Sequence, residues 1–273
     1  MAESMERSYE EQFTAFIDFL GFSEVSTGTD DTTRLKVLEL LVGLSALRGE
    51  FDLQSTNEDN RKTSQIKPAV STFSDHIVIS YPLRPIYAGI FPDEHISAFL
   101  ILGHFNQLLT RIAAAALRIG FLVRGGATIG KLYHARGVVF GEALVDAFRI
   151  ESRTSIYPRV VLSSQIASRP KWVENQPEVV RDSDGLYHVD YFKMLLLRAA
   201  PPGSTHQTAV KAWLDDAVAV IRRNLAEHER EGKLNELAKW AWFAREFRAG
   251  VERLNPELLK SLGVAPDSIP SYK

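Results

Sequence analysis

The stretch "AFIDFLGFSE" at residues 15–24 reads as a buried strand that ends in a turn. Apolar and aromatic residues dominate positions 13–19, which is typical of a strand. Asp18 interrupts this run, and Gly21 follows three residues later. An unpaired carboxylate is costly to bury, so the sequence must supply Asp18 with a partner.

Composition limits the classes of protein to consider. The chain has 273 residues, no cysteine and a formal net charge of −2. Its length allows one large domain or two small ones, and its charge gives no electrostatic footprint for nucleic acid. The apolar stretch 96–123 is interrupted by His104, Asn106, Gln107 and Arg111, so we expect no membrane span. The acidic start "MAESMERSYEEQ" indicates no secretory signal, and a chain without cysteine fits the cytoplasm.

Hydrophobic spacing predicts the order β-α-β-β-α-β in the first part of the chain. Leucines 35, 38, 41 and 44 recur at helical spacing and predict a helix at about 33–47, followed by a polar loop at 52–65. "AVSTFSDHIVISYP" reads as two strands joined by a tight turn at Ser74 and Asp75. Further along we expect a helix at about 94–119 capped by Asp93, strands at 121–134 and 158–163, and a strand passing into a helix between 137 and 152.

This order predicts an α+β fold, an α/β sandwich of the ferredoxin-like type with an antiparallel sheet and helices on one face. Such a sheet has a bare face and edges, which a second copy often covers. Two more helices are expected within 204–254, after a linker at "PPGS", 201–204. We therefore expect a catalytic domain at 1–200 and a helical extension at 204–273.

Two aspartates are expected to converge in this topology. Asp18 ends the first strand and Asp75 lies in the turn of the neighbouring hairpin. A divalent cation relieves the repulsion between two such carboxylates, and two carboxylates with a backbone carbonyl are usual ligands of Mg²⁺ or Mn²⁺. The turn after Asp18 offers backbone N–H groups to a triphosphate. The alternative is that each aspartate only caps a turn.

Four motifs together resemble the catalytic domain of class III nucleotidyl cyclases, over roughly residues 10–165. They are "FIDFLGFSE", "FSDHIVIS", "RGGATIG" and "FGEALVDAFRIES". The resemblance implies that Asp18, Asp75 and the carbonyl of Phe19 hold two Mn²⁺ or Mg²⁺ ions. It also implies that the turn at Gly21 and Phe22 binds the substrate.

The positions that read a purine in adenylate cyclases differ here. The base-reading lysine corresponds to Ser71, with Thr72 beside it, and the base-reading aspartate corresponds to Val138. The asparagine that orients the ribose corresponds to Val145. Arg149 matches the arginine that stabilises the transition state. The resemblance therefore implies intact phosphate chemistry with a different base pocket.

The sequence as a whole most resembles the pyrimidine cyclases of bacterial Pycsar anti-phage systems. The segments that carry this resemblance are "AFIDFLGFS", "RGGATIGKLYH", "VVFGEALVDAF" and "YPRVV". That resemblance implies cytoplasmic synthesis of cyclic UMP or cyclic CMP after phage infection, with UTP the favoured substrate. The product would activate a separate effector. The family's sites are shared across a homodimer, and neither nucleic acid nor a membrane is an expected partner.

Other interpretations stay open at this stage. Arg149 has an alternative interpretation as a surface ion pair with Asp146 or Glu151. Arg124 reads as a structural residue, and His76 is expected to face away from its neighbour Asp75. The rival functions are an adenylate or guanylate cyclase with an unusual pocket, and a catalytically silent module that binds nucleotide.

Overall fold

The computed structural model describes residues 9–22, 31–46, 53–56, 63–66, 68–83, 94–192, 207–253, 256–263 and 265–270. Contacts divide the chain into two compact units. Unit 1 comprises residues 1–106 and 123–189, and unit 2 comprises residues 107–122 and 190–273. The expected cap at Asp93 and the linker at 201–204 lie outside the described residues, and a domain boundary near residue 200 stays a prediction.

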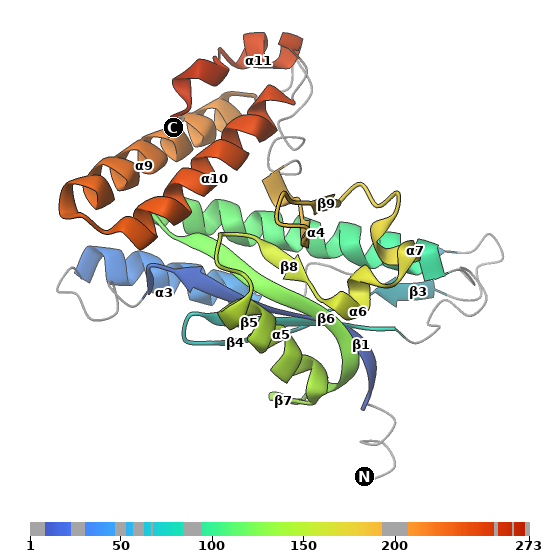
Figure 1. The fold of residues 1–273 in the computed structure, drawn as a ribbon. Coiled ribbons are helices and arrows are strands. Elements are labelled where there is room, and N and C mark those ends of the chain that lie inside the picture. Colours follow the sequence, from blue (N-terminus) through green and yellow to red (C-terminus); the bar gives the residue numbers. More distant parts are fainter. Residues whose placement is uncertain are drawn as a thin grey trace. The chain divides into compact units, whose positions relative to one another are not determined.

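Unit 1 has a mixed α+β fold built on an eight-stranded sheet (Figure 1). The main path through the sheet runs β4-β5-β1-β6-β8-β10-β9, and β7 pairs with β6. Strands β6 and β8 are parallel, so the expectation of a purely antiparallel sheet was wrong. The strands are β1 (Glu10–Leu20), β4 (Ala69–Phe73), β5 (His76–Pro82), β6 (Leu122–Ala135), β7 (Val138–Phe140), β8 (Val160–Leu162), β9 (Val179–Arg181) and β10 (Tyr187–Val189).

Strand β1 is buried on both faces from residue 12 to residue 19. On one face, the ring of Phe13 packs 5.2 Å from that of Phe105 in α4 (Glu94–Ile119). On the other face, Phe16 packs 5.4 Å from Phe148 in α5 (Glu142–Arg153). Since successive residues of a strand point to opposite faces, helices cover both sides of β1, and the prediction of helices on one face was wrong. A continuous apolar run is typical of a strand buried on both sides.

The remaining elements of unit 1 confirm some predictions and correct others. Helix α3 (Asp31–Ala46) forms where the leucine spacing predicts it, but Leu35 and Leu38 are exposed while Val37 is buried. The leucine spacing therefore predicted the helix correctly but did not identify the face that is buried. The predicted polar loop at 52–65 instead contains an antiparallel pair, β2 (Leu53–Thr56) and β3 (Thr63–Ile66). Two short helices complete the unit, α6 (Ser164–Ala167) and α7 (Pro170–Val173).

Within the part of the chain that the structure describes, α4 is the helix long and apolar enough to cross a membrane by length and composition. Of its most apolar window, 67% is buried inside the protein. A core helix of a folded domain passes the same test, so this feature is weak evidence for a membrane span.

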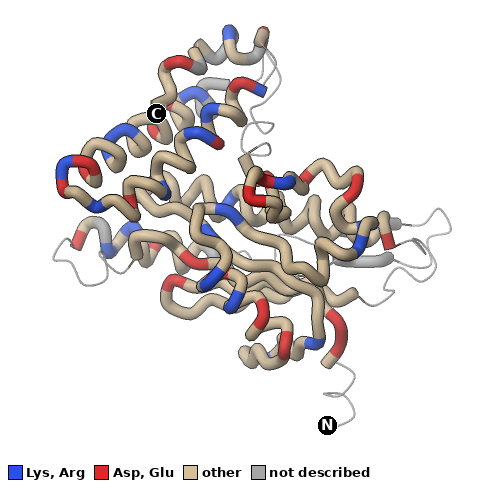
Figure 2. Tube along the Cα trace, in the orientation of Figure 1, with Lys and Arg blue, Asp and Glu red and all other residues tan. Residues whose placement is uncertain are grey.

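Unit 2 contains α9 (Gln207–Glu231) and α10 (Leu234–Glu252), which confirm the two predicted helices and lie side by side (Figure 1). Their core is aromatic, and the ring of Phe243 lies 5.2 Å from that of Phe192. Acidic and basic residues are interspersed along both helices (Figure 2). The unit ends with α11 (Pro256–Leu262) and a short 3₁₀ turn at Pro266–Ser268.

Gly126 in β6 allows α5 to approach the sheet closely. A Cβ atom at this position would lie 2.4 Å from the carbonyl oxygen of Ala147 and 2.8 Å from the backbone nitrogen of Glu151. Both atoms belong to the backbone of α5 and cannot rotate away. The second glycine of "RGGATIG" therefore sets the distance between β6 and α5.

We expect Gly126→Ala to lower the free energy of unfolding by about 1–3 kcal/mol, because the new methyl group forces α5 away from β6. Chemical denaturation with circular dichroism measures the change. Gly43→Ala is the matched control, since nothing lies within 4 Å of that added methyl group. This control should stabilise α3 by roughly 0.5–1 kcal/mol. Equal stability of Gly126→Ala and the wild type would contradict the packing described.

Arg159 stabilises the turn between β9 and β10 through two ion pairs. Its guanidinium is buried and pairs with both Asp182 and Asp184. The hydrogen bond from Arg159 lowers the pKa of the Asp184 carboxyl below its ordinary value of 3.8. This contribution to stability is present above pH 3.8 and is lost as the pH falls below it.

The stability of the wild type should therefore decline on acidification below about pH 4, partly through protonation of Asp184. Asp184→Asn removes this titration, so its unfolding free energy should fall less steeply over the same range. Denaturation series between pH 2.5 and pH 6 compare the two slopes. Identical slopes would show that Arg159 does not hold the Asp184 carboxylate.

Candidate metal centre

The pairing of β4, β5 and β1 places Asp18 and His76 on the same face of the sheet. Asp18 lies directly opposite His76, and His76 lies opposite Phe73 on the next strand. Cross-strand partners point their side chains to the same side. Ser74 (φ 53°) and Asp75 form the two-residue turn between β4 and β5, which brings Asp75 beside this row.

Asp18, Asp75 and His76 each offer one ligand atom, and these atoms lie within 4.8 Å of one another. Atoms that share one small divalent cation lie about 3–4.5 Å apart, because each is about 2.0–2.3 Å from the ion. Small side-chain rotations therefore bring this set into coordinating range. The predicted convergence of Asp18 and Asp75 matches this arrangement.

His76 bridges the two aspartates. Its Nδ1 lies 3.1 Å from Asp75 Oδ1, and its Nε2 lies 3.7 Å from Asp18 Oδ1. The prediction that His76 faces away from Asp75 was wrong. Asp75 belongs to the turn, where the alternation of side chains along a strand does not apply, and the cross-strand pairing fixes His76 beside Asp18.

Arg124 supplies the positive charge that Asp18 needs. Its Nε donates to Asp18 Oδ2 at 3.0 Å, and its Nη2 lies 2.7 Å from Glu151 Oε1. The side chains of Asp18 and Glu151 are 10% and 3% exposed. No local sequence pattern connects Arg124, expected to be structural, to either carboxylate. The feature that could have indicated this contact is the position of Arg124 at the start of "RGGATIG", on the strand next to β1.

Burial raises the pKa of the Glu151 carboxyl by removing water from it. The neighbouring Arg124 guanidinium acts in the opposite direction, and the charge of Asp18 adds to the increase. Glu151 and Asp18 therefore share one guanidinium as their positively charged partner. A divalent cation beside Asp18 would compete with Arg124 for that carboxylate.

Arg149 is not brought to the two aspartates within one chain. It is on α5, two residues before Glu151, and residues two apart on a helix point about 200° from each other. Glu151 faces the sheet, whereas the Arg149 side chain is 59% exposed and lies 3.3 Å from Asp146 Oδ1. The ion pair with Asp146 is formed and the pair with Glu151 is not, and the catalytic role of Arg149 stays a prediction.

A pocket of about 430 Å³ lies beside Arg149 in unit 1. It is bordered by α5, the end of β8 and the first residues of α6, and its walls carry several hydroxyl and amide groups. Thr128 Oγ1 donates to Gln165 Oε1 at 3.1 Å on one wall. Sequence motifs did not indicate Gln165, Thr154 or Ser164, because these residues come together only after α5 packs on the sheet.

The residues expected to replace the purine-reading set occupy different environments. Ser71 pairs with Val78, which pairs with Phe16, so Ser71 shares the face of Asp18. Thr72, one residue on, faces the opposite side. Ser71 Oγ lies 2.9 Å from His134 Nε2, whose Nδ1 lies 2.8 Å from Ser80 Oγ. Val138 and Val145 are both exposed, on β7 and α5 respectively.

The turn after β1 is described only at its start. Gly21 has φ 99°, a backbone conformation that favours glycine, so the predicted turn is confirmed. Phe19 is buried and Phe22 is half-buried. Residues 23–30, where we expect the triphosphate to bind, lie outside the described residues. The roles of Phe19, Gly21 and Phe22 therefore stay predictions.

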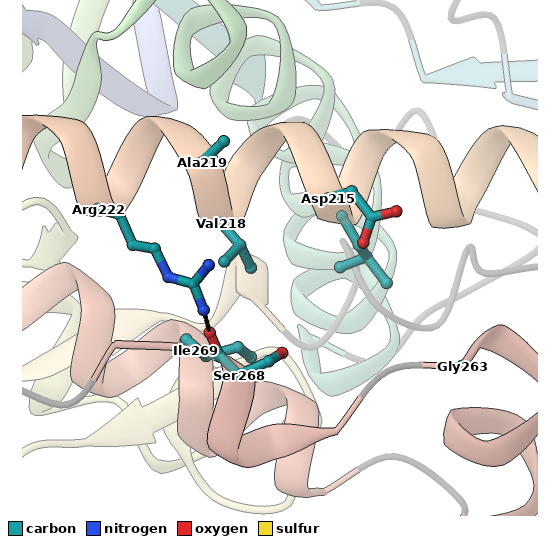
Figure 3. A pocket seen from close by; sticks show the side chains of 8 residues that line it. Asp215, Val218, Ala219, Arg222, Gly263, Ser268 and Ile269 are labelled. Carbon is teal, nitrogen blue, oxygen red and sulfur yellow. Dashed lines mark hydrogen bonds between the residues drawn. The ribbon is translucent and has the colours of Figure 1, made fainter.

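A second pocket, of about 220 Å³, belongs to unit 2 (Figure 3). It lies between α9 and the segment around Ser268, and Arg222 donates a hydrogen bond to the Ser268 carbonyl along one wall. Leu214 and Ile269 in its lining are buried, and Asp215 pairs with Lys211 at 2.7 Å. None of the residues expected at the catalytic site lines this pocket.

No family model and no curated protein matches this chain. Among the solved structures that match, one is the crystal structure of an adenylate/guanylate cyclase/hydrolase from Silicibacter pomeroyi. The two chains are 17% identical, the match covers 66% of this chain and 95% of the other, and the TM-score is 0.30. A likeness at this level carries no weight for function, which rests on the chain's own residues.

Proposed function

We propose that this chain is a nucleotidyl cyclase that converts UTP to 3′,5′-cyclic UMP and diphosphate. One observation carries the proposal: ligand atoms of Asp18, Asp75 and His76 converge within 4.8 Å on one face of the sheet. The same two aspartates are the metal positions that the class III cyclase resemblance implies. The strand order β4-β5-β1-β6 supports a ferredoxin-like arrangement of the catalytic core.

In this reaction the ribose 3′-oxygen bonds to the α-phosphorus, the bond from that phosphorus to the bridging oxygen breaks, and the hydroxyl proton passes to solvent. Asp18, Asp75 and the carbonyl of Phe19 would hold two Mn²⁺ or Mg²⁺ ions. Bound there, the ions lower the pKa of the attacking hydroxyl and neutralise charge on the leaving diphosphate. His76 orients Asp75 through the 3.1 Å contact. Arg149 would stabilise charge on the α-phosphate.

The site is proposed to form between two copies of the chain. Glu151 and Arg149 lie on opposite sides of α5, so one chain presents the aspartates and the arginine in different directions. Several apolar side chains of unit 1 are exposed to solvent. Two of them, Phe73 and Phe148, pack against Phe16. A second copy would cover them and bring its own Arg149 and adjoining pocket to the aspartates. The exposed apolar residues of β4, β7 and α5 are Phe73, Val138, Phe140, Val145 and Phe148.

UTP is the proposed substrate and CTP is the first alternative. Ser71 shares the face of Asp18, and its hydroxyl is already held by His134. By the cyclase resemblance, Ser71 and Val138 replace the lysine and the aspartate that read a purine, and Val145 replaces the asparagine that orients the ribose. The two valine side chains offer no hydrogen bonds. The role of the product as a second messenger for an anti-phage effector rests on the Pycsar resemblance alone.

A catalytically silent, nucleotide-binding module is the second candidate function. One observation favours it: the Arg124 guanidinium already pairs with the Asp18 carboxylate, so this carboxylate has a positively charged partner without a metal ion. Such a module would bind nucleotide and release no diphosphate.

Incubation of the chain with each of the four nucleoside triphosphates and Mn²⁺ distinguishes these functions. We expect cyclic UMP as the main product, identified by chromatography and mass spectrometry. Asp18→Ala and Asp75→Ala should each abolish it, because either change removes a ligand of the proposed ions. Product from ATP or GTP in preference to pyrimidines would refute the base assignment. Nucleotide binding without diphosphate release would establish the silent module.

Mixing two inactive variants tests the shared site. Asp18→Ala and Arg149→Ala should each be inactive, the latter by about 10³–10⁵-fold, as for other arginines that stabilise phosphoryl transfer. After subunit exchange, half of the dimers are mixed and each has one intact site of two, so about a quarter of the wild-type rate should return. If both variants fold and dimerise but mixing restores no activity, the site is not shared.

A further inference from the structure

One guanidinium serves two carboxylates at the candidate metal centre. Arg124 Nε bonds Asp18 at 3.0 Å, and Nη2 of the same side chain lies 2.7 Å from Glu151. An arginine edge usually binds both oxygens of a single carboxylate. Here the edge is divided between β1 and α5, so neither carboxylate has the guanidinium to itself.

The three side chains are enclosed, which strengthens their dependence on each other. Arg124 is 23% exposed, and Asp18 and Glu151 are 10% and 3% exposed. Charges interact more strongly where water is excluded, and removing one partner leaves a buried charge uncompensated. A cation that binds Asp18 must therefore displace or share the guanidinium.

We propose that Arg124 is a positioning residue of the metal centre: it holds Asp18 while no cation is bound, and Glu151 receives its guanidinium when a cation binds Asp18 and Asp75. This inference rests on the proposed function, because it requires a cation at the two aspartates. Glu151 is the alternative partner that keeps Arg124 paired in both states. Movement of the guanidinium toward Glu151 clears one oxygen of Asp18 for the ion.

The proposal predicts opposite effects from two substitutions. Arg124→Met removes the competing positive charge and leaves three carboxylates, so Mn²⁺ should bind about tenfold more tightly or better. Glu151→Gln removes a negative charge and the alternative partner, so Arg124 stays on Asp18 and Mn²⁺ should bind about tenfold more weakly or worse. A purely structural role would weaken binding in both variants or change neither.

The experiment titrates the full chain with Mn²⁺ in the absence of nucleotide and counts free Mn²⁺ by electron paramagnetic resonance. Arg153→Met and Glu174→Gln are the charge-matched controls, because both residues are exposed and neither lies at the metal centre. Each control should leave the dissociation constant within twofold of the wild type. Asp75→Asn should weaken binding severely, which identifies the site being measured. Circular dichroism verifies that each variant is folded.

Opposite shifts for Arg124→Met and Glu151→Gln would support the inference. Unchanged affinities, or weaker binding in both, would overturn it while leaving the metal centre in place, provided that Asp75→Asn still loses Mn²⁺. If the wild type binds no Mn²⁺, the proposed function fails and the inference fails with it. If Arg124→Met does not fold, Arg124→Gln takes its place in the same comparison, because it also removes the positive charge while its amide can still donate to a buried carboxylate.

Discussion

The guanidinium of Arg124 joins β1 to α5 through two buried carboxylates, and the candidate metal centre of unit 1 depends on this connection. Asp18 lies inside an apolar strand, where a carboxylate needs a partner of opposite charge, and Arg124 lies within hydrogen-bond distance of it. Glu151 extends the network to the helix that also carries Arg149. The close approach of α5 to β6, which Gly126 permits, is what allows one arginine to reach both carboxylates.

This connection gives α5 two different sides. The side of Glu151 is tied to the sheet, and the side of Arg149 faces solvent and the pocket bordered by α6. Within one chain, Asp18 and Asp75 therefore face a different direction from Arg149. The proposed site therefore requires a second copy of the chain, and the exposed rings of Phe73 and Phe148 are suited to the surface that such a copy would cover.

Much of this arrangement could be predicted from sequence. Most helices and strands follow from hydrophobic spacing, and the convergence of Asp18 and Asp75 follows from a hairpin placed beside the first strand. What could not be predicted depends on contacts distant in sequence. Arg124 meets Asp18 across 106 residues, a contact set by strand order and register rather than by any local pattern. Strand pairing also places His76 beside Asp18, and His76 contacts Asp75 because Asp75 belongs to the turn, where alternation along a strand does not apply.

The central claim is that Asp18 and Asp75 together bind a divalent cation. Anomalous diffraction from a crystal soaked in Mn²⁺ and a non-reactive UTP analogue measures this most directly. The account predicts a manganese peak between the two carboxylates, with Arg124 turned from Asp18 toward Glu151. A map with no peak at this position, and with Arg124 still bonded to Asp18, would contradict it.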